Sequence, residues 1–128
     1  MMNRLLPGAL CALLMAGCAG EGEKRSNISF AADVQPVFEE HCTLCHAEGV
    51  RQGGVALDSY ENLVRSRYFS RPTPLVIPGK PEESRIYLVI HSTNPGIRMP
   101  PPGTGIDPPG RYAIETIRIW IEEGAKNN

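Results

Sequence analysis

Apolar residues recur at intervals of three and four positions in several stretches of the chain, a spacing that predicts amphipathic helices. The first helix is expected from Asp33 to about Cys42, with Val34, Val37 and Phe38 on its inner face. Aspartate is a favoured helix N-cap, so we expect this helix to begin at Asp33.

A second, shorter helix is predicted just after Asp58. The sequence from Asp58 to Glu61 resembles a capping box, in which an N-cap residue is followed three positions later by glutamate. We expect three residues of this helix to face inward: Tyr60, Leu63 and Val64.

A third helix is predicted to open at Pro81, because proline suits the first turn of a helix. Its apolar side carries Ile86, Val89 and Ile90, and His91 falls at its end.

The last helix is expected over residues 111–123, with a cap at Asp107 and a stop at Gly124. Trp120 should pack against the first helix around Phe38. The apolar stripe of this helix consists of Ala113, Ile117, Trp120 and Ile121.

Composition indicates long loops between these helices. The 128 residues include 12 prolines and 13 glycines, and only 6% are aromatic, so a large side-chain core is not expected. The chain is long enough for one domain at most. The net charge of −1, with no long basic run, gives no indication of nucleic-acid binding.

One short motif carries chemistry: Cys42 and Cys45 are three positions apart and His46 follows directly. This order is the attachment site of a c-type haem. On a helix, positions i and i+3 point to one side, so both thiols can form thioethers to one porphyrin. His46 then serves as the proximal iron ligand. One buried haem c would also supply the apolar surface that the side chains lack.

Two other interpretations of the motif exist. A thioredoxin-like Cys-x-x-Cys pair needs a βαβ setting, which the sequence does not offer. A zinc site needs a second ligand pair, and the other cysteines, Cys11 and Cys18, belong to an export segment.

Residues 1–17 are typical of a signal peptide, with Arg4 before an apolar run too short to span a bilayer. The segment from Leu14 to Cys18 resembles a lipobox, which implies cleavage before Cys18 and lipidation of that cysteine. The alternative is an ordinary cleaved signal and a soluble periplasmic protein. Ala19 after the lipidated cysteine mildly favours the outer membrane. Residues 18–29 are then expected to form a flexible tether, and residues 30–128 the domain.

Met99 is the only methionine outside the export segment, and it lies in a proline-rich stretch over residues 94–109. Prolines stiffen a loop, and a stiff loop with one thioether suits a sixth iron ligand. The alternatives are a core gap-filling role for Met99 and His91 as the ligand. Arg98 either pairs with a haem propionate or is a plain surface residue.

Three arginines, Arg65, Arg67 and Arg71, lie close together after the second helix. They form either a solvated basic rim, which is the usual role of such a run, or a docking patch for a redox partner.

These motifs together resemble class I c-type cytochromes, and more narrowly the planctomycete-type cytochrome c domain. The resemblance rests on the Cys42–His46 motif and on four further segments: 30–37, 78–84, 98–101 and 119–125. It implies an all-α fold of three to four helices around one covalent haem, with the first and last helices crossing beside it. It also implies single-electron transfer outside the cytoplasm.

We therefore expect a membrane-tethered monohaem electron carrier with iron ligated by His46 and Met99, and not an enzyme. Its partners would be redox proteins and, through the lipid on Cys18, a membrane. Two alternatives stay open: a gas sensor or weak peroxidase with an open sixth site, and a cytochrome subunit of an oxidase or dehydrogenase complex.

Overall fold

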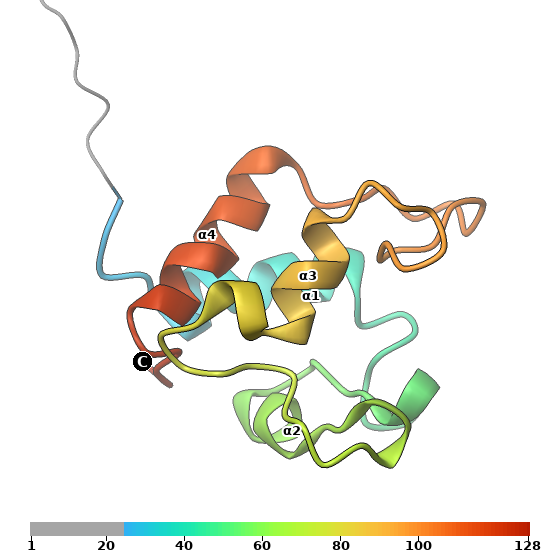
Figure 1. Ribbon diagram of the computed structural model, residues 1–128, viewed down its shortest axis with the longest axis horizontal. Coiled ribbons are helices and arrows are strands. Elements are labelled where there is room, and N and C mark those ends of the chain that lie inside the picture. Colours follow the sequence, from blue (N-terminus) through green and yellow to red (C-terminus); the bar gives the residue numbers. More distant parts are fainter. Residues whose placement is uncertain (1–24) are drawn as a thin grey trace, which may run out of the picture.

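The computed structural model of the protein describes residues 25–128, and in this part of the chain all regular structure is helical (Figure 1). Four α-helices are present there: α1 (Gln35–His41), α2 (Tyr60–Arg65), α3 (Arg85–His91) and α4 (Arg111–Glu122). Short turns of other helix types precede or join them: η1 (Phe30–Val34), η2 (Gln52–Gly54), η3 (Tyr68–Ser70) and η4 (Pro81–Glu83). The predicted all-α class is confirmed. Among the described helices none has the length and apolar character needed to cross a membrane.

The first helical segment begins three residues earlier than predicted. Ser29 is the N-cap of η1, and its hydroxyl accepts a hydrogen bond from the amide of Ala32. Asp33 is not the cap. Its carboxylate accepts a hydrogen bond from the amide of Ser29 at 2.8 Å. The side chains of Ser29 and Asp33 thus each accept from a backbone amide at the start of the turn. The π-helical turn η1 then runs directly into α1.

Residues 25–29, expected to be part of the tether, instead belong to the folded domain. The amides of Asn27 and Ile28 donate to the Glu123 carboxylate at 2.8 and 2.9 Å. The apolar side chain of Ile28 is buried in the core. A single apolar residue at the end of a polar segment did not indicate that the folded domain begins there. The two ends of the described chain therefore lie side by side (Figure 1). The predicted signal peptide and Cys18 lie outside the described residues.

The core forms where the segment 30–41 packs on α4. The ring of Phe30 lies between those of Phe38 and Trp120, at centroid distances of 6.4 and 5.5 Å, and Tyr60 meets it edge-on at 5.2 Å. Trp120 therefore reaches α1 through Phe30. Nine residues predicted to face inward are buried: Val34, Phe38, Leu63, Ile86, Val89, Ile90, Ile117, Trp120 and Ile121. Three more, Val37, Tyr60 and Ala113, are partly buried. Only Val64 is exposed, with 42% of its surface accessible, because the six-residue helix α2 buries one narrow face.

The helix starts differ from the predictions in small ways. Ser59, and not Asp58, caps α2 by accepting from the amide of Asn62. The residue before α4 is Gly110, with no side-chain cap, so Asp107 does not cap this helix. Helix α4 ends before Gly124, whose φ of +101° is left-handed and suits a glycine.

Two long loops flank α1 and α3 and carry the chemistry of the chain. The first, after residue 46, is held against η3, where a Cβ on Gly54 would meet the Arg67 carbonyl oxygen at 2.8 Å. Only glycine permits this contact, which brings Tyr68 close to the loop that follows His46. The second loop leaves α3, runs out over residues 93–110 and returns to α4 (Figure 1).

Candidate functional site

The Cys42–His46 motif lies in a turn directly after α1, not on the helix itself. Helix α1 ends at His41, and Cys42 leaves helical geometry with φ −129°. The Cys42 carbonyl accepts from the amides of Cys45 at 3.1 Å and His46 at 2.9 Å, so the turn keeps a helix-like spacing. Both cysteines are free thiols. Burial raises the pKa of the Cys42 thiol to about 12, so it keeps its proton at neutral pH.

The ring of His46 is oriented by one backbone carbonyl. Its Nδ1 lies 3.1 Å from the Gln52 carbonyl oxygen, which can only accept, so Nδ1 carries the proton. Nε2 therefore presents a lone pair. Burial lowers the pKa of His46, outweighing the hydrogen bonds to the backbone of Gln52 and Val55, which raise it. The neutral imidazole is the form that binds iron.

Two backbone hydrogen bonds hold the loop that supplies this carbonyl, one to Cys45 and one to His46. The amide of Gln52 donates to the Cys45 carbonyl at 3.1 Å, and the amide of Leu57 donates to the His46 carbonyl at 2.7 Å. The orientation of the imidazole is thus built into the backbone. The amino-acid sequence does not identify Gln52 as this acceptor, because any residue can offer a backbone carbonyl.

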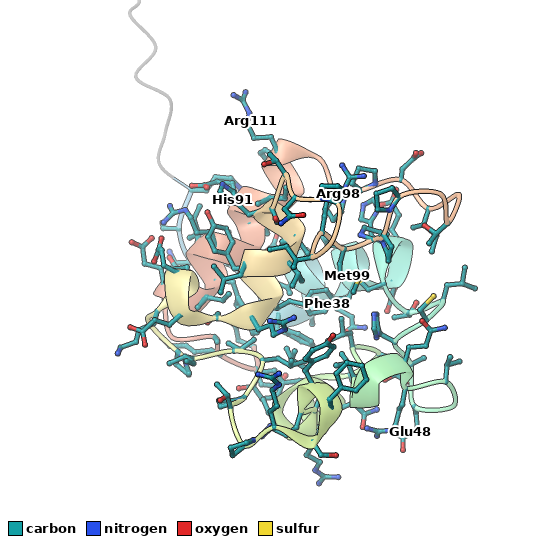
Figure 2. All side chains as sticks on the ribbon, turned by 45° about the vertical axis from the view of Figure 1, so that its right-hand side comes forward. Phe38, Glu48, His91, Arg98, Met99 and Arg111 are labelled. Carbon is teal, nitrogen blue, oxygen red and sulfur yellow. The ribbon has the colours of Figure 1, made fainter. Side chains whose placement is uncertain are left out.

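Met99 faces the same space as the motif. Its amide donates to the Val89 carbonyl of α3 at 3.0 Å, which fixes the start of the loop on that helix. Met99 is partly buried and packs against the hydrophobic core (Figure 2). Two adjoining cavities, of about 500 and 330 Å³ with their open mouths included, share three wall residues: Cys42, His46 and Met99.

The larger cavity is apolar apart from one permanent charge. Its remaining walls are Val55, Leu57, Tyr68, Leu75, Arg85, Ile86, Val89 and Ile90. The Arg85 guanidinium stacks over the Tyr68 ring at 4.3 Å, and no carboxylate of the described residues pairs with it. Sequence reasoning missed Arg85, because a lone arginine at the start of a helix belongs to no motif.

The two other residues weighed for the site lie outside both cavities. His91 is exposed at the end of α3 and stacks on Tyr87 at 5.2 Å. Arg98 lies farther out than Met99 in Figure 2, and its Nε is buried with no acceptor among the described residues. The geometry thus brings Met99, and not His91, to the wall shared with His46.

His41 is mostly buried, with 12% of its side chain exposed, and it lines the smaller cavity. Helix α1 ends at this residue, and the turn that follows places Cys45 and His46 on the wall of the same cavity.

The two competing interpretations of the motif find no support in the described part of the chain. Residues 25–128 contain no strand, so they offer no βαβ setting for a thioredoxin-like pair. Within the same range, no three His, Cys, Asp or Glu side chains cluster as metal ligands.

Comparison with known families agrees with the site. The family model described as Planctomycete cytochrome C matches residues 42–103. The chain carries a planctomycete-type cytochrome c domain. No curated protein and no solved structure matches the chain.

Membership in this cytochrome family implies covalently bound haem c. The residues of the site fit that group. Two free thiols three positions apart lie beside an apolar cavity, with an imidazole Nε2 lone pair and one thioether on its walls. The matched range contains both thiols, His46, Met99 and Arg85, but neither His41 nor α4.

Proposed function

We propose that this c-type cytochrome is a monohaem carrier of single electrons, with iron ligated by His46 and Met99. The observation that carries the proposal is the shared wall: Cys42, His46 and Met99 border both cavities, although Met99 is 53 positions from His46 in the sequence. Bound haem would supply one iron that exchanges a single electron.

The chain's own residues have distinct roles in this proposal. Cys42 and Cys45 hold the group covalently, so it cannot be lost outside the cell. His46 offers Nε2 while Gln52 fixes its ring, and Met99 offers its thioether from a loop anchored on α3. If His46 and Met99 both bind the iron, no position would be left on it for a substrate, which favours a carrier over a sensor or peroxidase.

Arg85 is assigned the propionate edge of the haem. Vinyl and propionate groups occupy opposite edges of a haem. Arg85 lines only the larger cavity and Cys45 only the smaller one, while Cys42 lines both. An unpaired guanidinium at an apolar wall suits a carboxylate. Arg98, with its buried Nε but no place in either cavity wall, is the weaker candidate.

An equilibrium redox titration of the purified protein tests this function. One haem and one electron give a single reversible wave in which the oxidised-to-reduced ratio changes tenfold per about 59 mV. Two waves, or a protein without covalent haem, would contradict the proposal.

The same titration tests Arg85. We expect Arg85→Gln to lower the midpoint potential by roughly 10–40 mV, the equivalent of a surface ion pair worth about 0.2–1 kcal/mol. The reason is that an unbalanced propionate charge favours ferric iron. Arg111→Gln is the matched control, because Arg111 projects into solvent (Figure 2). Equal shifts in both variants would show a general charge effect and reject the assignment.

We further propose that the protein is a lipoprotein, anchored by acyl chains on Cys18 and facing the periplasm or cell exterior. Of the two membranes, Ala19 slightly favours the outer one. Support comes from the sequence around Cys18 alone. Several acyl chains anchor a protein stably, whereas none leaves it soluble. We expect the native protein to fractionate with membranes and Cys18→Ser to be released. A membrane-bound Cys18→Ser protein would contradict lipid anchoring.

A further inference from the structure

The loop from Pro100 to Pro109, between Met99 and α4, has very few hydrogen bonds to the rest of the protein. Five of its ten residues are prolines, which lack an amide donor. Two of its hydrogen bonds are internal: the Thr104 hydroxyl donates to the Pro101 carbonyl and accepts from the Ile106 amide. Among residues 25–128, one hydrogen bond connects this loop to another element, and it runs from His41 to Asp107.

That hydrogen bond joins the haem-motif side of the protein to the loop that follows Met99. The Nδ1 of His41 lies 2.9 Å from the Asp107 carbonyl oxygen, so Nδ1–H is the donor. The ring is mostly buried, and it lines the smaller cavity together with Met99, Pro100 and Pro101. Its other nitrogen, Nε2, is 3.8 Å from the exposed carboxylate of Glu40.

We propose that His41 is a positioning residue that latches the loop 100–109 and so keeps the Met99 thioether at the iron. This inference rests on the proposed His46–Met99 ligation. The loop is stiff but is held to the rest of the fold at few points. Met99, just before the loop, donates to Val89, and Asp107, within it, accepts from His41. Helix α4 follows the loop directly. Without the His41 contact the loop swings more freely, and Met99 leaves the iron more often.

An external ligand measures how often the sixth position is open. Its apparent affinity scales with the fraction of molecules in the open state. This hydrogen bond is solvent-exposed, and the loss of an ordinary hydrogen bond shifts such an equilibrium by roughly two- to tenfold. We therefore expect His41→Ala to bind imidazole, added to the ferric holoprotein as the probe, roughly two- to tenfold more tightly than the native protein.

Two further variants separate a latch from a packing role. The amide nitrogen of asparagine occupies about the place of Nδ1, whereas that of glutamine occupies about the place of Nε2. We expect His41→Asn to restore an affinity near the native one and His41→Gln to behave like His41→Ala. Glu40→Gln is the control for the Nε2 side and should change nothing. The denaturation midpoint of each holoprotein, measured alongside, shows that any difference between Asn and Gln is not one of global stability.

The outcomes distinguish this inference from the function on which it rests. If the native protein shows no thioether-ligated low-spin spectrum before imidazole is added, the proposed ligation fails. If that spectrum is present and the affinity of His41→Ala is unchanged, the latch alone is rejected. Equal gains for the Ala, Asn and Gln variants would likewise reject the latch, because the ring would then act by packing.

Discussion

Met99→Ala is expected to make the reduced protein bind carbon monoxide stoichiometrically, whereas the native protein should bind none. The thioether is the protein's ligand at the sixth position in our account, and alanine has no atom that can replace it. The midpoint potential should fall as well, because a methionine opposite a histidine raises it. Absorption spectra of the reduced protein with and without carbon monoxide measure the first effect, and the redox titration measures the second.

Two variants serve as controls for Met99. Met99→His should close the sixth position again, because imidazole is an iron ligand, while leaving the potential low. His91→Ala should resemble the native protein, since His91 stacks on Tyr87 outside both cavities. If His91→Ala bound carbon monoxide and Met99→Ala did not, His91 and not Met99 would be the sixth iron ligand.

Trp120→Ala is expected to cost about 3–5 kcal/mol of the free energy of unfolding. The side chain is 1% exposed, packs on Phe30 and Tyr60, and donates from Nε1 to the Lys126 carbonyl at 2.9 Å. Its removal leaves a cavity where η1 meets α4. Denaturant unfolding of the holoprotein, followed by circular dichroism, measures the loss.

Tyr112→Ala provides the matched aromatic control on the same helix. Tyr112 is 68% exposed and its ring contacts the Arg25 guanidinium, so its loss should cost no more than about 1 kcal/mol. Trp120→Phe should lie between the two, because it keeps a ring against Phe30. A Trp120→Ala protein as stable as Tyr112→Ala would show that the aromatic cluster does not hold the first and last helices together.

The periodicity of apolar residues predicts most of the helices and their buried faces, because each helix has one apolar face. The buried positions Phe38, Leu63, Ile86 and Trp120 all follow from spacing. The start of the domain did not, since the Ile28 amide is bound by the carboxylate of Glu123, which is 95 residues away. Val64 was misassigned because periodicity gives the direction of a face but not its width.

The site followed the same division. Cys42, His46 and Met99 are distinctive residue types in distinctive settings, so the sequence singled them out, and the structure brings them to one wall. Gln52 contacts the site through its backbone carbonyl, and Arg85 and His41 belong to it because the fold places them at the two cavities. These positions depend on tertiary structure, so no local sequence pattern predicts them. The ligand roles of Cys42, Cys45, His46 and Met99, and the lipidation of Cys18, stay predictions.

The central claim is that the haem of this cytochrome has both axial positions occupied by its own residues. The most direct measurement is the absorption spectrum of the native holoprotein, oxidised and reduced, before and after carbon monoxide is added. Our account predicts a low-spin c-type spectrum in both states and no change on addition of carbon monoxide to the reduced form. A spectrum that shifts at once to that of a carbon monoxide adduct would contradict it and favour a ligand-binding haem protein.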